Sequence, residues 1–182
     1  MKKIIISGYY SGGEFELSKD VSAKEIKDYF DFLLIENKIN NSDITQHIKE
    51  KIQEGHLIYP GGMAFYDSEK YLITGCCFNL NDLKEACTNI LNSNSAWLGH
   101  DPDLTTKYVD DNVLFFESEG FDDEQDVDGN EIVVFTKEEI NSLLLEANEK
   151  IQEFINIFYA YLNNNYPDIA EIIIEDLKKC LI

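Results

Sequence analysis

Arginine is absent from this 182-residue chain, because all 15 basic residues are lysine. The guanidinium group is the side chain that grips phosphate or carboxylate through two parallel hydrogen bonds, so its absence disfavours phosphoryl transfer. The chain also carries 35 acidic residues and a formal net charge of −20. Proteins bind nucleic acid largely by neutralising its phosphates with lysine and arginine, so we expect no nucleic-acid partner.

Long apolar runs are missing as well. The opening segment 1–7 contains only a short apolar stretch, Ile4-Ile5-Ile6, which is too short for the core of a signal peptide. No run approaches the roughly 20 residues that a membrane-spanning helix needs. We therefore expect a cytoplasmic protein with no membrane contact.

Cysteine is scarce and lacks metal-binding or redox spacing. The four cysteines, Cys76, Cys77, Cys87 and Cys180, form no CxxC motif, and a chain of this length needs no disulfides to stabilise its core. We expect reduced thiols. Cys76 and Cys77 follow an apolar segment, and neighbours on a strand point to opposite faces, so we expect one of them in the core.

The chain does contain enough apolar sequence for a folded core. Hydrophobic residues make up 44% of it, and no low-complexity linker divides it. The sequence therefore predicts a single domain over residues 1–182.

The clearest signal is a long amphipathic helix over residues 136–165. Its apolar residues recur at the three-then-four spacing of one helical stripe, from Ile140 to Leu162. Thr136 and Glu139 have the spacing of a capping box, and Pro167 ends the helix at the other side.

Shorter elements flank this helix. Alternating or β-branched segments predict strands, and Ser22 with Glu25 predicts a second capping box. Three predicted hairpins pair strands 3–10 with 13–18, 62–66 with 71–78 and 104–109 with 113–117, and the other predicted strands are 56–59 (short) and 131–135. The remaining predicted helices begin near residues 22, 44 and 168, and a fourth is capped by Asn79 or Asn81. This order indicates an α+β fold, with a mostly antiparallel sheet of about five to seven strands and helices packed on one side.

Acidic residues are concentrated between residues 101 and 131, a segment that contains twelve carboxylates and one lysine, Lys107. Such a block is often only a solvated surface loop. It can also steer a cationic protein into contact, with interleaved aromatic residues as anchors. The predicted partner-binding residues are Asp101, Asp103, Asp110, Asp111, Phe116, Glu117, Glu119, Phe121, Asp122, Asp123, Glu124, Asp126 and Asp128.

The sequence contains only incomplete matches to motifs for catalysis or metal binding. Residues 124–129 resemble the first half of an EF-hand loop, but the twelfth position is Phe135 instead of the required glutamate. His100 beside Asp101 could act as an oriented base with a thiol as nucleophile, but the stronger interpretation is structural, with Trp97 as a core anchor, Asp101-Pro102 as a turn and the histidine bonded locally. Three scattered histidines do not make a zinc site, so we predict no metal and no cofactor.

Residues 61–117 provide one resemblance. The string Trp97-Leu-Gly-His-Asp-Pro102, followed by Tyr108 and the run Asp110-Asp-Asn-Val113, resembles segments of small bacterial immunity proteins. Proteins of that kind bind and neutralise a toxin domain made by the same cell or its kin. The resemblance implies a toxin-binding role and supplies no site residues.

The hypothesis that follows is a non-enzymatic, acidic binding protein of the immunity type that occludes a basic protein toxin, with a nuclease as the expected class. An acidic surface can occupy the cationic groove that a nuclease uses for its substrate. One alternative is a small hydrolase-like enzyme that uses His100 and Asp101 or the thiols. Another is a structural or regulatory module whose long helix joins a homodimer.

Overall fold

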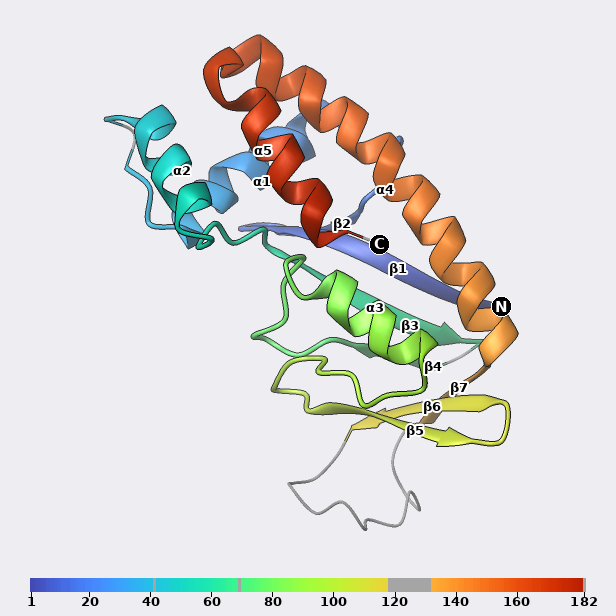
Figure 1. The fold of residues 1–182 in the computed structure, drawn as a ribbon. Coiled ribbons are helices and arrows are strands. Elements are labelled where there is room, and N and C mark those ends of the chain that lie inside the picture. Colours follow the sequence, from blue (N-terminus) through green and yellow to red (C-terminus); the bar gives the residue numbers. More distant parts are fainter. Residues whose placement is uncertain (41, 69, 118–131, 182) are drawn as a thin grey trace.

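The computed structural model describes residues 1–40, 42–68, 70–117 and 132–181 (Figure 1). Over these ranges the chain forms seven strands and five helices. In chain order they are β1 (Lys2–Tyr10), β2 (Gly13–Glu16), α1 (Ala23–Glu36), α2 (Ile44–Gln53), β3 (Gly61–Asp67), β4 (Lys70–Ile73), α3 (Leu83–Leu91), β5 (Leu104–Val109), β6 (Asn112–Glu117), β7 (Ile132–Thr136), α4 (Lys137–Asn165) and α5 (Pro167–Cys180).

The strands form two antiparallel sheets. The first has four strands in the order β2-β1-β3-β4, and the second has three in the order β5-β6-β7. The prediction of an α+β fold with antiparallel strands and a long helix near the C-terminus is confirmed. The prediction of one sheet is wrong, because the seven strands are divided four and three.

Side chains, and not a backbone ladder, join the two sheets. The ring of Phe65 on β3 stacks on the ring of Phe115 on β6 with 3.9 Å between centroids, and Phe135 of β7 meets both at their edges. All three rings are fully buried. Alternation of apolar residues identifies each strand but does not say which strands share a ladder, which is why the sequence could not separate the two sheets.

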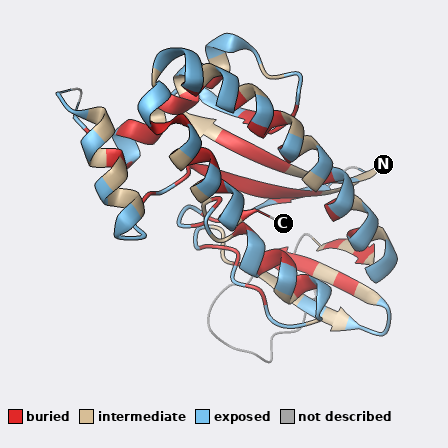
Figure 2. Cartoon of the chain, turned by 45° about the horizontal axis from the view of Figure 1, so that its top comes forward, coloured by how far each residue is buried: buried red, intermediate tan, exposed pale blue. Residues whose placement is uncertain are grey.

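The helices cover the first sheet by aromatic packing. Phe15 of β2 meets Tyr29 of α1 at 5.7 Å and Phe154 of α4 at 5.8 Å between ring centroids. Figure 1 shows α4 running past β1, with α5 folded back beside it. Buried residues gather on the strands and on the helix faces turned toward them (Figure 2).

The long helix begins and ends where the sequence predicts. Thr136 accepts a hydrogen bond from the N–H of Glu139, whose carboxylate accepts one in return from the N–H of Thr136. The helix stops at Asn165, and α5 starts at Pro167 because proline has no N–H to continue the helix. The apolar stripe from Ile140 to Leu162 is buried within the chain.

Two predicted strands are wrong or shorter than expected. Residues 56–59 form no strand, because the side-chain amides of Asn37 and Asn81 bond the backbone there in place of a neighbouring strand. Strand β4 ends at Ile73, because beyond it the N–H of Gly75 turns to the carbonyl of Leu98. The predicted hairpins 3–18 and 104–117 are present with nearly the expected bounds.

Within the described ranges, no helix combines the length and apolar character that crossing a bilayer requires.

Candidate functional site

The β5–β6 hairpin carries the described part of the acidic segment. Leu104 pairs with Glu117 at one end of the ladder, and Val109 pairs with Asn112 at the other. Asp101, Asp103 and Glu117 therefore lie at the first end and Asp110 and Asp111 at the turn. Six residues of strand separate the two ends by about 17 Å, so these carboxylates form two groups and not one cluster.

The turn group lies beside the start of α4. The carbonyl of Asp111 accepts a hydrogen bond from the N–H of Lys137, the first residue of that helix, at 2.9 Å. Asp110, Asp111 and Glu138 are all exposed there. Glu138 is an acidic neighbour that the sequence did not suggest, because it is 27 positions away from Asp111 and only the β6–β7–α4 connection brings it back.

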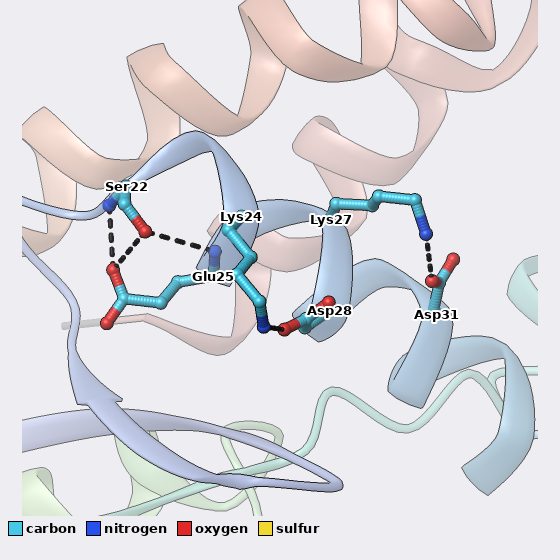
Figure 3. A network of polar contacts seen from close by, with 6 residues as sticks. All are labelled: Ser22, Lys24, Glu25, Lys27, Asp28 and Asp31. Atoms are coloured by element: carbon cyan, nitrogen blue, oxygen red, sulfur yellow. Dashed lines mark hydrogen bonds and ion pairs between the residues drawn. The ribbon is translucent and has the colours of Figure 1, made fainter.

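Several acids outside the hairpin are paired with the chain's own lysines. On α1, Lys24 pairs with Asp28 and Lys27 with Asp31, one helical turn apart (Figure 3). Lys150 of α4 similarly holds Glu16 of β2, at 2.9 Å.

Three of the acids on or beside the hairpin differ in this respect. Among the residues that the structure describes, Asp101, Asp110 and Asp111 take part in no ion pair. All three are exposed. Within the described ranges, no lysine or histidine neutralises these three carboxylates through an ion pair.

The aromatic anchors predicted within the acidic segment are not on the described surface. Phe116 is 6% exposed, so its ring packs inside the protein and is not offered to a partner. The rest of the predicted partner-binding residues lie outside the described residues, together with the segment that resembles an EF-hand. These are Glu119, Phe121, Asp122, Asp123, Glu124, Asp126 and Asp128.

A second group forms where two distant loops meet. The N–H of Gly75 donates to the carbonyl of Leu98 at 2.8 Å, and the N–H of Cys76 donates to the carbonyl of His100 at 2.5 Å. A Cβ on Gly75 would lie 2.1 Å from the His100 oxygen, so only glycine permits this approach. The contact brings the thiols near His100 and Asp101.

The Cys76 thiol is not activated in this arrangement. Cys76 and Cys77 are both exposed, with their sulfur atoms 3.6 Å apart, so the expectation that one lies in the core is wrong. The pKa of Cys76 is raised, chiefly by its contact with the Cys77 thiol and further by the Asp101 carboxylate. A raised pKa lowers the fraction of thiolate, which is the nucleophilic form.

The imidazole of His100 does not complete a catalytic dyad. Its ring meets the edge of Trp97 at 5.9 Å, and within the described part of the chain no hydrogen bond joins it to either thiol. No group of three or more histidine, cysteine or acidic residues suited to a metal ion occurs in that part either.

No protein-family model matches this sequence, and the searches of curated proteins and of solved structures return no match to it.

Proposed function

We propose that this chain is a non-enzymatic binding protein of the immunity type, which neutralises a basic protein toxin of the nuclease class by covering its cationic surface. One observation carries the proposal. Asp110 and Asp111 stand exposed at a turn, outside the ion pairs of the described residues, in the most acidic part of the chain.

Electrostatic steering gives these carboxylates a role. Exposed carboxylates make the local electrostatic potential more negative. They thereby attract a cationic partner and speed its association, especially at low ionic strength. The two aspartates also lie near the positive end of the α4 dipole, which contributes about 0.3–1 kcal/mol to stability for such a placement. Binding and stability must therefore be measured separately on the same variants.

The alternatives receive less support from the described geometry. An enzyme built on the Cys76–His100 contact would need an activated thiol, whereas the pKa of Cys76 is raised. A homodimer through the apolar stripe of α4 would need that stripe exposed, whereas it is buried within the chain. A partner protein that binds at the acidic hairpin requires neither an activated thiol nor an exposed apolar stripe on α4.

The first experiment identifies the partner and tests its class. The tagged protein is used to capture partners from the cells that encode it, and each captured protein is purified and assayed for cleavage of DNA and RNA. We expect a basic nuclease that one equivalent of the chain inhibits. An acidic partner, or a partner whose activity the chain leaves unchanged, would contradict the proposal.

The second experiment tests the surface. Asp110→Lys with Asp111→Lys should slow association with that nuclease about tenfold or more at low salt and reduce the salt dependence. The control is Glu149→Lys with Glu171→Lys, exposed acids on α4 and α5 that change the net charge equally. Equal slowing by both pairs would show that only net charge matters, and unchanged kinetics in both would remove the hairpin from the interface.

A further inference from the structure

Two adjacent thiols touch on the surface of this protein. The sulfur atoms of Cys76 and Cys77 are 3.6 Å apart, and both residues are exposed. Neighbouring residues on a strand would point their side chains to opposite faces. The contact arises because β4 has already ended at Ile73 and the backbone at Cys76 and Cys77 is a turn.

The backbone around this turn is fixed from two sides. Gly75 and Cys76 donate their N–H groups to the carbonyls of Leu98 and His100, and Phe78 donates its N–H to the carbonyl of Gly75 at 3.0 Å. Gly75 also packs so closely against His100 that no side chain would fit between them. The approach of the two thiols is therefore a property of the folded loop and does not depend on side-chain rotation alone.

We propose that Cys76 and Cys77 form a redox-active dithiol, which closes to a disulfide between adjacent residues when it meets a low-molecular-weight disulfide of the glutathione type. One thiolate attacks a sulfur of the small disulfide and releases the first small thiolate. The second thiolate then attacks the protein sulfur of the mixed disulfide and releases the other. Both protons pass to the released thiolates, so the protein loses two electrons and the small disulfide gains them.

Such a disulfide is reversible and not structural. Closing the bond moves the sulfur atoms from contact to about 2.05 Å and creates an eight-membered ring that includes the peptide bond between the two cysteines. The ring is strained and exposed, and disulfides with those properties are readily reduced. The pair therefore responds to the thiol–disulfide balance around the protein.

The other two cysteines serve as internal controls. Cys87 is 1% exposed, and burial raises its pKa to about 12. Cys180 is partly buried, and burial with the nearby Asp176 carboxylate raises its pKa to about 11. The pKa of Cys76 is raised as well, but Cys76 and Cys77 are exposed and their sulfur atoms are in contact, so accessibility distinguishes the pair from the two controls. Neither control is expected to react under conditions that oxidise the surface pair.

The chain also contains a built-in reporter. Trp97 is its only tryptophan, and the ring stacks on Phe78 at 6.1 Å, directly after Cys77. A disulfide at positions 76 and 77 would form beside this aromatic pair, and disulfides quench indole fluorescence. Oxidation of the dithiol should therefore lower the emission of Trp97.

The test treats the full-length protein with mixtures of oxidised and reduced glutathione at pH 8, followed by acid quenching, alkylation and mass spectrometry. Cleavage after Lys70 and Lys84 releases peptide 71–84, which contains Cys76 and Cys77 but neither control cysteine. We expect this peptide to lose the mass of two hydrogen atoms, Trp97 emission to fall, and dithiothreitol to reverse both changes.

Two variants complete the test. Cys77→Ser should carry one glutathione on Cys76 and form no internal disulfide, whereas Cys87→Ser with Cys180→Ser should behave like the wild type. A wild-type protein that retains glutathione adducts on peptide 71–84, that cross-links to a second chain or that does not react would overturn the proposal. These outcomes are independent of toxin binding, and the wild-type mass measurement decides the question even if a variant does not fold.

Discussion

The side-chain amide of Asn37 bonds both backbone groups of Ile58. Its Oδ1 accepts from the N–H of Ile58 and its Nδ2 donates to the carbonyl of Ile58, each at 2.8 Å. The same Nδ2 donates to the carbonyl of Leu33 near the end of α1, also at 2.8 Å. One buried asparagine thus takes the place of a strand partner and ties the segment before β3 to α1.

Replacing Asn37 with alanine should lower the free energy of unfolding by about 2–4 kcal/mol, because it leaves the backbone groups of Ile58 without partners in a partly buried place. Chemical denaturation followed by circular dichroism measures the change. Asn164→Ala, at an exposed position on α4, is the control and should stay within about 0.5 kcal/mol of the wild type. Similar values for both variants would show that the amide bridge contributes little.

Tyr29→Phe should stabilise the protein by about 1 kcal/mol at pH 7. The Tyr29 ring is fully buried, and its hydroxyl has no hydrogen-bond partner among the described residues, so removing the oxygen relieves a desolvation cost. Burial also raises the pKa of Tyr29. The folded protein therefore keeps this proton above pH 10, where the unfolded chain loses it, and stability falls as pH rises. The advantage of the variant should grow above pH 10.

Tyr59→Phe is the matched comparison and should have the opposite sign at pH 7. Tyr59 is equally buried, but its hydroxyl lies 3.1 Å from both the Asp176 carboxylate and the carbonyl of Ile173. Losing these contacts should cost about 1–2 kcal/mol. Thermal unfolding of both variants at pH 7 and pH 10.5 provides the measurements. Destabilisation by Tyr29→Phe at pH 7 would refute the argument about its unpartnered hydroxyl.

Glu139→Gln should weaken the start of α4 in a pH-dependent way. Hydrogen bonds from Lys2 and from the N–H of Thr136 lower the pKa of Glu139, so its charge contributes stability above the unfolded pKa of about 4.3, and this contribution is lost as pH falls below it. The expected cost at pH 7 is below about 1 kcal/mol, because the pair is partly exposed.

The difference between Glu139→Gln and the wild type should therefore shrink as the pH falls from 7 to 3. Glu25→Gln in the capping box of α1 is the comparison, because Ser22 and not a lysine supplies its main hydrogen bonds. Denaturation at several pH values measures both variants. A cost for Glu139→Gln that stays constant from pH 3 to pH 7 would exclude the role of charge.

Cys77→Ala should make Cys76 more reactive toward alkylation at neutral pH. Contact with the Cys77 thiol is the largest cause of the raised pKa of Cys76, so its removal increases the fraction of thiolate. The rate at which iodoacetamide modifies peptide 71–84 measures the effect. Asp101→Asn should act in the same direction more weakly, because the Asp101 carboxylate is a smaller cause. A slower rate in Cys77→Ala would contradict this account.

The local elements of the fold were largely predictable. The boundaries of α4 follow from the Thr136–Glu139 capping box and from Pro167, since both act within a few residues of the chain. The hairpin at residues 104–117 follows from alternating apolar residues around a polar turn. The strand predicted at residues 56–59 failed because the sequence signal cannot show that asparagine side chains satisfy that backbone.

The sequence predicted the charge of the candidate site but not how its residues are arranged in space. The charge of the acidic segment is a property of composition, but its division between the two ends of the β5–β6 hairpin depends on strand register. Phe116 could not be assigned to the surface or the core by its position among acids, and packing buries it.

By itself, then, the sequence determined the helices, the hairpins and the excess of negative charge, because these depend on residues close together in the chain. Only the tertiary structure decided that the strands form two sheets, that Glu138 joins Asp110 and Asp111, and that Cys76 and Cys77 touch beside His100. Each of these depends on backbone and side-chain contacts between segments far apart in sequence, and no local pattern records which segments will meet.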